Sequence, residues 1–302
     1  MQDAEGAQSD LQKKVASWLS TEGYPTEFQT ASIFRRHGFR VFQGHHVRNA
    51  DDGTPREIDV LAHMDHAIAE RPLIRCEFVV ECKWSGKKPW VMFASKSARM
   101  AASACISQTI SSTFGTAVMW HLAGDAECKN MAIFRTPTEP GFGGRQAFSK
   151  GQDVFYSALN TVTSAATHRM RQYDKLRKPG TLPRFCVVTF PIVVVDGELF
   201  EATFSEEVGG IQVMPAESAR CHWTGAPEWK LHSSIDVVTL RGLHTFLEMR
   251  KPQIVRLLEL MNDAAREISD CYSAKSIDKL KIKSGSRGIV GLPGLLQEIV
   301  SS

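Results

Sequence analysis

The sequence predicts an α/β protein with a mixed central β-sheet flanked by helices. Two helical segments precede three strand-like segments between residues 9 and 84. A long helical pattern over residues 151–175 separates these strands from further strand-like segments between residues 185 and 241. The chain of 302 residues is 43% hydrophobic and 23% charged, which is ordinary for a globular protein with a substantial core.

The N-terminal helices are predicted from apolar spacing and from their end signals. Ser9 is a suitable N-cap, and apolar residues then recur at helical spacing until Gly23. Pro25 opens a second helix that ends at Gly38. We therefore expect two short helices ahead of the first strand.

Three strands are predicted next, over residues 39–47, 56–63 and 75–84, because these segments are rich in branched and aromatic residues. Short apolar runs indicate two more strands over residues 116–123 and 131–134. The residues that follow, 136–146, are rich in proline and glycine and predict a loop.

The second half of the chain continues the α/β pattern. The apolar run over residues 185–204 turns at Asp196–Gly197, which predicts a β-hairpin. A strand is predicted over residues 234–240, and a helical region over 242–268 is expected to be interrupted near Pro252.

We expect a single domain over residues 1–302. Its catalytic half would span about residues 9–85, and an insertion would occupy about residues 86–150. The sheet extension and C-terminal helices would fill about residues 151–302, with a basic tail near their end.

Composition limits the classes of function and location. The net charge of +3 excludes a basic field over the whole surface but leaves room for a local basic groove. Seven cysteines without a C-x-x-C pair argue against a disulfide framework and a zinc ribbon. The histidine pairs lack third and fourth zinc ligands at suitable spacing. We expect a cytoplasmic protein with no signal peptide and no membrane span.

The chemistry is predicted from the strand RCEFVVECKW. Side chains alternate along a strand, so Glu77, Val79, Glu81 and Lys83 share one face. Burying an acid and a base in an apolar strand costs several kcal/mol unless something compensates. A metal ion is one compensation, and a surface ion pair on an edge strand is the alternative.

Asp59 lies on the preceding strand, 22 positions before Glu81, so the two carboxylates meet if the strands pair. Two carboxylates with water and phosphate oxygens form a hard site that suits Mg²⁺ or Mn²⁺. A metal there would polarise a phosphodiester and lower the pKa of bound water. Lys83 would orient the nucleophile or stabilise developing negative charge.

The pattern of Glu57, Ile58 and Asp59, followed by Glu81-Cys82-Lys83, resembles the PD-(D/E)xK nuclease superfamily, although the proline of that name is absent. The resemblance implies a restriction-endonuclease-like core. It also implies a metal bound by Asp59, Glu81 and the main-chain carbonyl of Cys82, with Lys83 catalytic. Glu57 is expected to orient other groups or to be solvated rather than to bind metal.

The superfamily often supplies one more acid from the preceding helix, and Glu27 fits that position as a catalytic and metal-binding residue. Helical phase places Glu27 with Ala31 and Phe34 on an inward apolar face. The alternative is an acid that only complements the helix dipole in the first turn.

Nucleic-acid contacts are expected from several residues outside this cluster. Gln152 and Tyr156 form a Q-x-x-x-Y pattern similar to that of RecB-like nucleases, where it helps to grip DNA. Lys87 and Lys88 directly follow the catalytic strand, and Arg145 lies in the glycine-rich segment. Lys96 and Arg99 come soon after, and for all these cations a solvated surface is the alternative.

We therefore expect a Mg²⁺- or Mn²⁺-dependent endonuclease that hydrolyses phosphodiester bonds in DNA. The resemblance makes a prokaryotic restriction or phage-defence setting the first expectation. Two alternatives stay open, namely a non-catalytic nucleic-acid-binding or scaffold protein and a nuclease subunit targeted by a separate partner. A homodimer is also compatible, since cutting both strands favours two active sites.

Overall fold

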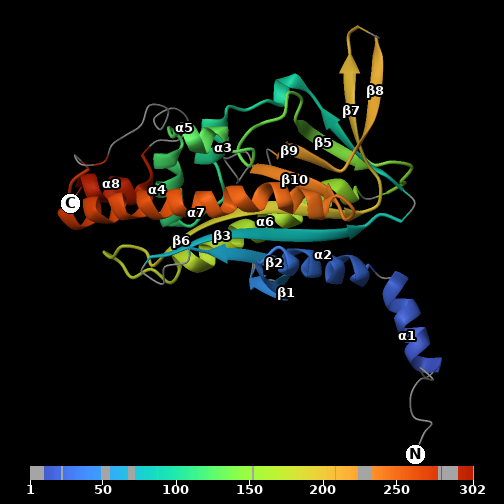
Figure 1. The fold of residues 1–302 in the computed structure, drawn as a ribbon, viewed down its shortest axis with the longest axis horizontal. Coiled ribbons are helices and arrows are strands. Elements are labelled where there is room, and N and C mark those ends of the chain that lie inside the picture. Colours follow the sequence, from blue (N-terminus) through green and yellow to red (C-terminus); the bar gives the residue numbers. More distant parts are fainter. Residues whose placement is uncertain are drawn as a thin grey trace, which may run out of the picture.

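The computed structural model shows an α/β fold built on one mixed sheet of ten strands among the residues it describes. It describes residues 10–21, 23–48, 55–66, 72–86, 88–151, 153–207, 209–223, 233–277, 280 and 292–301. The expected class, a mixed sheet with flanking helices, is confirmed (Figure 1).

The strands are β1 (Arg40–Arg48), β2 (Pro55–Asp65), β3 (Leu73–Trp84), β4 (Trp90–Ala94), β5 (Gly141–Gln146), β6 (Phe185–Asp196), β7 (Leu199–Ser205), β8 (Gly210–Ala216), β9 (Ser218–Trp223) and β10 (Ser233–Thr239). The helices are α1 (Asp10–Thr21), α2 (Tyr24–Arg36), α3 (Ala102–Ser107), α4 (Thr113–Leu122), α5 (Ala126–Asn130), α6 (Val154–Asp174), α7 (Leu243–Ala274) and α8 (Gly294–Ser301), with a 3-10 turn η1 (Lys96–Ala98).

The strand order is β1-β2-β3-β6-β10-β9-β5-β4-β7-β8. β1, β2 and β3 form an antiparallel meander, and β6 then joins β3 in parallel over the full length of both strands. The expected strands in the first 85 residues and the expected antiparallel pairing of β2 with β3 are confirmed.

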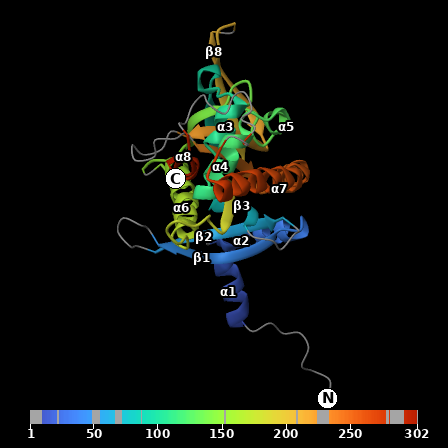
Figure 2. The ribbon, with the colours of Figure 1, turned by 90° about the vertical axis from the view of Figure 1, so that its left-hand side faces the viewer.

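Helices cover both faces of the sheet, as Figure 2 shows with α6 and α7 on opposite sides. Apolar side chains of α6 pack with one set of strand residues, which includes Val79 and Val193. Side chains of α2, α4 and α7 pack with the alternate set, which includes Phe78 and Val80. β3 is buried over most of its length because helices cover both faces, and its charged residues Glu77 and Glu81 are buried with it.

Residues 86–150 contain β4, β5 and helices α3 to α5, and two predictions here were wrong. Residues 116–123 lie mostly in α4, and residues 131–134 form a turn rather than a strand. Nearly every residue of α4 is buried, so no polar stripe reveals its helical period.

The predicted loop over residues 136–146 ends in strand β5, which is a further correction. Glycine is required in β5 because neighbouring atoms approach its backbone closely, and not because the chain turns there. A Cβ atom on Gly144 would lie 2.6 Å from the Phe155 ring and 2.6 Å from the carbonyl oxygen of Val91. β5 is therefore a glycine-rich strand that packs closely against α6 and β4.

The predicted hairpin at Asp196–Gly197 is also wrong, because β6 pairs with β3 and β10 whereas β7 pairs with β4 and β8. A Cβ atom on Gly197 would overlap the hydroxyl of Ser85, which donates a hydrogen bond to the carbonyl of Asp196 at 3.1 Å. Gly197 thus marks a packing contact between the ends of β3 and β6.

The predicted interruption near Pro252 does not occur, since α7 runs through it as one helix. The single domain, its catalytic half and the insertion stay predictions. The basic tail near residues 275–288 lies mostly outside the described residues. No helix among the described residues combines the length and apolar character that a membrane crossing requires.

Candidate active site

The predicted catalytic residues gather where β2 begins, β3 ends and α2 begins. Val60 pairs with Val80, which places Asp59 and Glu81 one step beyond that pair on neighbouring strands. An oxygen of Asp59, Oδ2, accepts a hydrogen bond from the backbone N–H of Cys82 at 2.7 Å. Lys83 Nζ lies 2.5 Å from Glu81 Oε1.

Strand alternation works as predicted around Glu81. The side chains of Val80 and Cys82 join the core beneath α2 and α7, while Val79 joins the core beneath α6. Glu81 is only 7% exposed, whereas the side chain of Lys83 is 30% exposed. The ion pair therefore has a buried acid and a cation that reaches toward solvent.

The β1–β2 ladder is interrupted beside Asp59. Gln43 pairs with Val60 and His45 pairs with Ile58, and Gly44 between them has a φ of 61°. This left-handed conformation suits glycine, because a side chain there would be strained. Asp59 therefore stands at an irregular point of the sheet, with its carboxylate directed to the backbone of β3.

Negative charge accumulates at this site. Burial and the charge of Asp59 raise the pKa of Glu81 to about 7, although Lys83 opposes the rise. Burial raises the pKa of Asp59 despite the hydrogen bond from Cys82. Burial and the charges of Asp59, Glu57 and Glu81 raise the pKa of Glu27 to about 7.

Among the described residues, Lys83 is the cation that offsets this negative charge. Burial disfavours its charged form, but the Glu81 carboxylate outweighs that effect and raises the pKa of Lys83. Three carboxylates thus share one ammonium group, and each keeps a raised pKa.

The donor atoms that this site offers are carboxylate oxygens. Among the described residues no three His, Cys, Asp or Glu side chains are drawn together tightly enough to form a metal cage. One oxygen of Asp59 and one of Glu81 are held by hydrogen bonds, which leaves Oδ1 and Oε2 for a metal. The charges of Asp59 and Glu81 both raise the pKa of Glu27 on α2. Hard oxygen donors of this kind suit Mg²⁺ or Mn²⁺.

The candidate nucleic-acid residues divide into three groups. Lys88 and Arg145 are exposed near the end of β3, where the side-chain amide of Gln146 donates to the carbonyl of Ser85 at 3.3 Å. Tyr156 is exposed, but its ring packs against Trp223 on β9. Lys87 and Gln152 fall outside the described residues.

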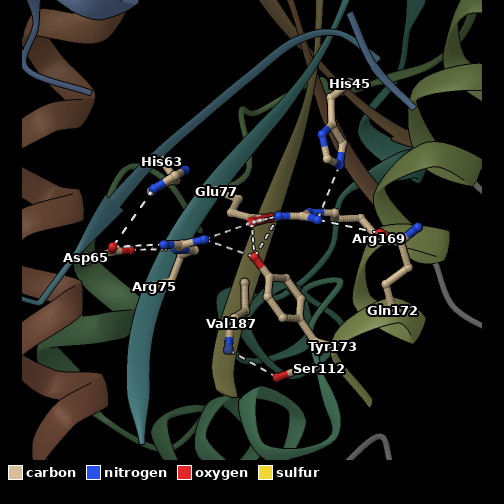
Figure 3. Close-up of polar contacts among 10 residues, drawn as sticks. All are labelled: His45, His63, Asp65, Arg75, Glu77, Ser112, Arg169, Gln172, Tyr173 and Val187. Carbon is tan, nitrogen blue, oxygen red and sulfur yellow. Dashed lines mark hydrogen bonds and ion pairs between the residues drawn. The ribbon is translucent and has the colours of Figure 1, made fainter. Parts of the chain in front are cut away.

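A buried polar network on the same face of β3 was missed (Figure 3). Glu77 is fully buried, and its Oε1 accepts a hydrogen bond from the hydroxyl of Tyr173 at 2.6 Å and one from Arg169 at 3.3 Å. Arg75 donates to Tyr173 at 3.1 Å and forms a two-point ion pair with Asp65. Alternation places Glu77 on the face of Glu81, but nothing local in the sequence identifies its partners on α6.

In comparisons with known proteins, no family matches this chain, and no curated protein or solved structure shows significant similarity to it.

Proposed function

We propose that this chain is a metal-dependent endonuclease that hydrolyses phosphodiester bonds in DNA and has a restriction-endonuclease-like core. The observation that carries the proposal is the convergence of Asp59, Glu81, Glu27 and Lys83 at one end of β3, with more negative charge than one lysine offsets. The resemblance of residues 57–59 and 81–83 to PD-(D/E)xK nucleases supports it.

Asp59, Glu81 and the carbonyl of Cys82 would hold Mg²⁺ or Mn²⁺, with Glu27 binding the metal or its water. The bound metal would polarise the phosphodiester and lower the pKa of the attacking water. Lys83 would place its ammonium group beside the scissile phosphate and stabilise charge on the phosphoryl oxygens. Its anchor on Glu81 would hold that group in position.

A non-catalytic scaffold explains these residues less well. Buried carboxylates with raised pKa values destabilise the folded protein at neutral pH. A scaffold would gain nothing from that loss of stability, whereas a metal-dependent enzyme uses the same charges to bind its cation.

The test is incubation of the purified protein with plasmid, linear duplex and single-stranded DNA in the presence of Mg²⁺. Asp59→Ala and Lys83→Ala should abolish cleavage and leave the circular dichroism spectrum unchanged. Lys178→Ala, which changes an exposed lysine in the loop after α6, is the matched control and should cleave normally. Normal cleavage by either site variant would overturn the assignment.

A second candidate is a nuclease subunit that a separate protein directs to its target, and the β7–β8 hairpin favours it. The hairpin projects from the body of the molecule (Figure 1). Register and alternation give it one wholly apolar face of Phe200, Ala202, Phe204, Ile211, Val213 and Pro215. Phe204 and Ile211 are 66% and 75% exposed.

The charge of this hairpin favours a protein over DNA as its partner. Residues 199–216 contain Glu201, Glu206 and Glu207 and no lysine or arginine, so the hairpin would repel phosphates. We assign it to a protein subunit with an apolar surface flanked by basic residues. Cleavage by the purified chain at a rate that no copurifying protein raises would contradict this second candidate.

A further inference from the structure

A region of unpaired positive charge lies away from the candidate active site. It is a pocket of about 430 Å³ between the segment that precedes α3 and the turn that follows α5. Arg99, Lys129 and Arg135 line it together with Thr136, Met100 and two alanines. In Figure 1, α3 and α5 lie far from the end of β3 that carries Lys83.

Hydrogen bonds join the two walls of this pocket. The hydroxyl of Thr136 donates to the carbonyl of Met100 at 2.8 Å, and the thiol of Cys105 lies 3.6 Å from the same hydroxyl. These contacts tie the chain before α3 to the turn after α5. The backbone that carries the side chains of the pocket is therefore fixed by the fold.

A buried cation fixes the turn that carries Arg135. Arg220 forms a two-point ion pair with Asp236 at 2.7 and 2.8 Å. Its remaining nitrogen donates to the carbonyls of Ile133 at 2.7 Å and Arg135 at 3.1 Å. The backbone of Arg135 is thus anchored in the core while its side chain stays exposed.

The charge of the pocket is not balanced by neighbouring acids. No aspartate or glutamate lines it. Within the described part of the chain, none of the side chains of Arg99, Lys129 and Arg135 forms an ion pair, although the structure has ion pairs on many other arginines. Glu127 on α5 is held by Arg256 at 2.6 and 2.8 Å, so it does not neutralise Lys129.

We propose that this pocket binds a phosphate group of a nucleotide-sized ligand. Two guanidinium groups and one ammonium group supply the forked and point-like donors that phosphate oxygens accept. The volume falls in the range of small-molecule sites. A free nucleotide and a nucleotide at the end of a nucleic-acid strand share this chemistry.

The test uses the full chain in EDTA, so that the candidate metal site takes no part. ATP binding is followed by titration calorimetry, and binding of a fluorescent duplex is followed by anisotropy. The variants are Arg99→Ala/Arg135→Ala and Lys129→Ala, which alter only side chains that reach solvent. Lys178→Ala, an exposed lysine elsewhere, is the control.

The double variant should weaken binding roughly 100-fold or more, as the loss of two charged hydrogen bonds would, while Lys178→Ala binds normally. Loss of ATP binding alone identifies a free nucleotide as the ligand, and loss of duplex binding alone identifies a strand. Because binding is measured in EDTA, where the metal-dependent reaction cannot run, the proposal does not depend on nuclease activity. Absence of ATP and duplex binding by the unaltered protein, or equal binding by the double variant and the control, would overturn it.

Discussion

Replacement of Glu81 by glutamine should make the metal-free protein more stable at alkaline pH while it removes activity. Glutamine keeps the shape of the side chain and removes its charge. The partner left behind, Lys83, has a side chain that is 30% exposed and can be solvated. The stability gained by removing the buried charge of Glu81 should therefore exceed the stability lost with the Glu81–Lys83 ion pair.

The size of the effect comes from the pKa of Glu81, which is 4.5 in an unfolded chain and about 7 in the folded protein. The folded protein binds the proton of Glu81 more tightly than the unfolded chain does. Protonation of Glu81 therefore stabilises the folded protein fully below pH 4.5, and this stabilisation disappears as the pH rises through 7. At pH 8 the buried charge costs the folded protein about 3 kcal/mol, at 1.36 kcal/mol per pH unit. Loss of repulsion on Asp59 and Glu27 acts in the same direction.

The assay is urea unfolding at pH 5 and pH 8, in EDTA and in Mg²⁺. In EDTA at pH 8, Glu81→Gln should unfold at a higher urea concentration than the unaltered protein. The difference between their midpoint urea concentrations should be smaller at pH 5. Mg²⁺ should stabilise the unaltered protein and have no effect on the variant. The exposed acid Glu207 provides a control as Glu207→Gln. If Glu81→Gln is no more stable than the unaltered protein at pH 8 in EDTA, the reasoning fails.

The remaining predictions concern the metal and two packing contacts. Cleavage should stop in EDTA and return with Mn²⁺ or Mg²⁺, whereas activity with zinc alone would contradict an oxygen-rich site. Burial and the charge of Glu77 raise the pKa of Tyr173 to about 12, so its hydroxyl keeps its proton and donates to Glu77. Tyr173→Phe should lower the free energy of unfolding by about 2 kcal/mol, measured by urea titration, and an unchanged value would contradict the network. Gly197→Ala should destabilise by about 1–3 kcal/mol because the added methyl group overlaps the Ser85 hydroxyl. The double variant with Ser85→Gly should recover much of that loss in thermal unfolding, and no recovery would show that the strain lies elsewhere.

The candidate active site was predictable because its determinants are local. Alternation along a strand fixes Glu81 and Lys83 on one face wherever that strand lies in the sheet. The helical phase of Glu27 follows from α2 alone, and the meander of β1 to β3 follows from short connections between successive strands. These signals have periods of two or 3.6 residues and need no knowledge of the rest of the chain.

The predictions of secondary structure were wrong where the same short sequence pattern is compatible with two structures. The Asp196–Gly197 pair is typical of a hairpin turn, yet Gly197 serves close packing against Ser85. The apolar segment of α4 resembles a strand because almost all of it is buried. Burial on every side removes the polar stripe from which a helix is recognised.

The amino-acid sequence by itself determined the order of the first elements and the chemistry expected of Asp59, Glu81 and Lys83, because both follow from spacing along the chain. Only the tertiary structure decided which distant strands are neighbours, which partners hold Glu77, and how α3 and α5 bring Arg99 and Arg135 into one pocket. Contacts of this kind depend on which surfaces are buried together, and no short pattern of residues specifies that.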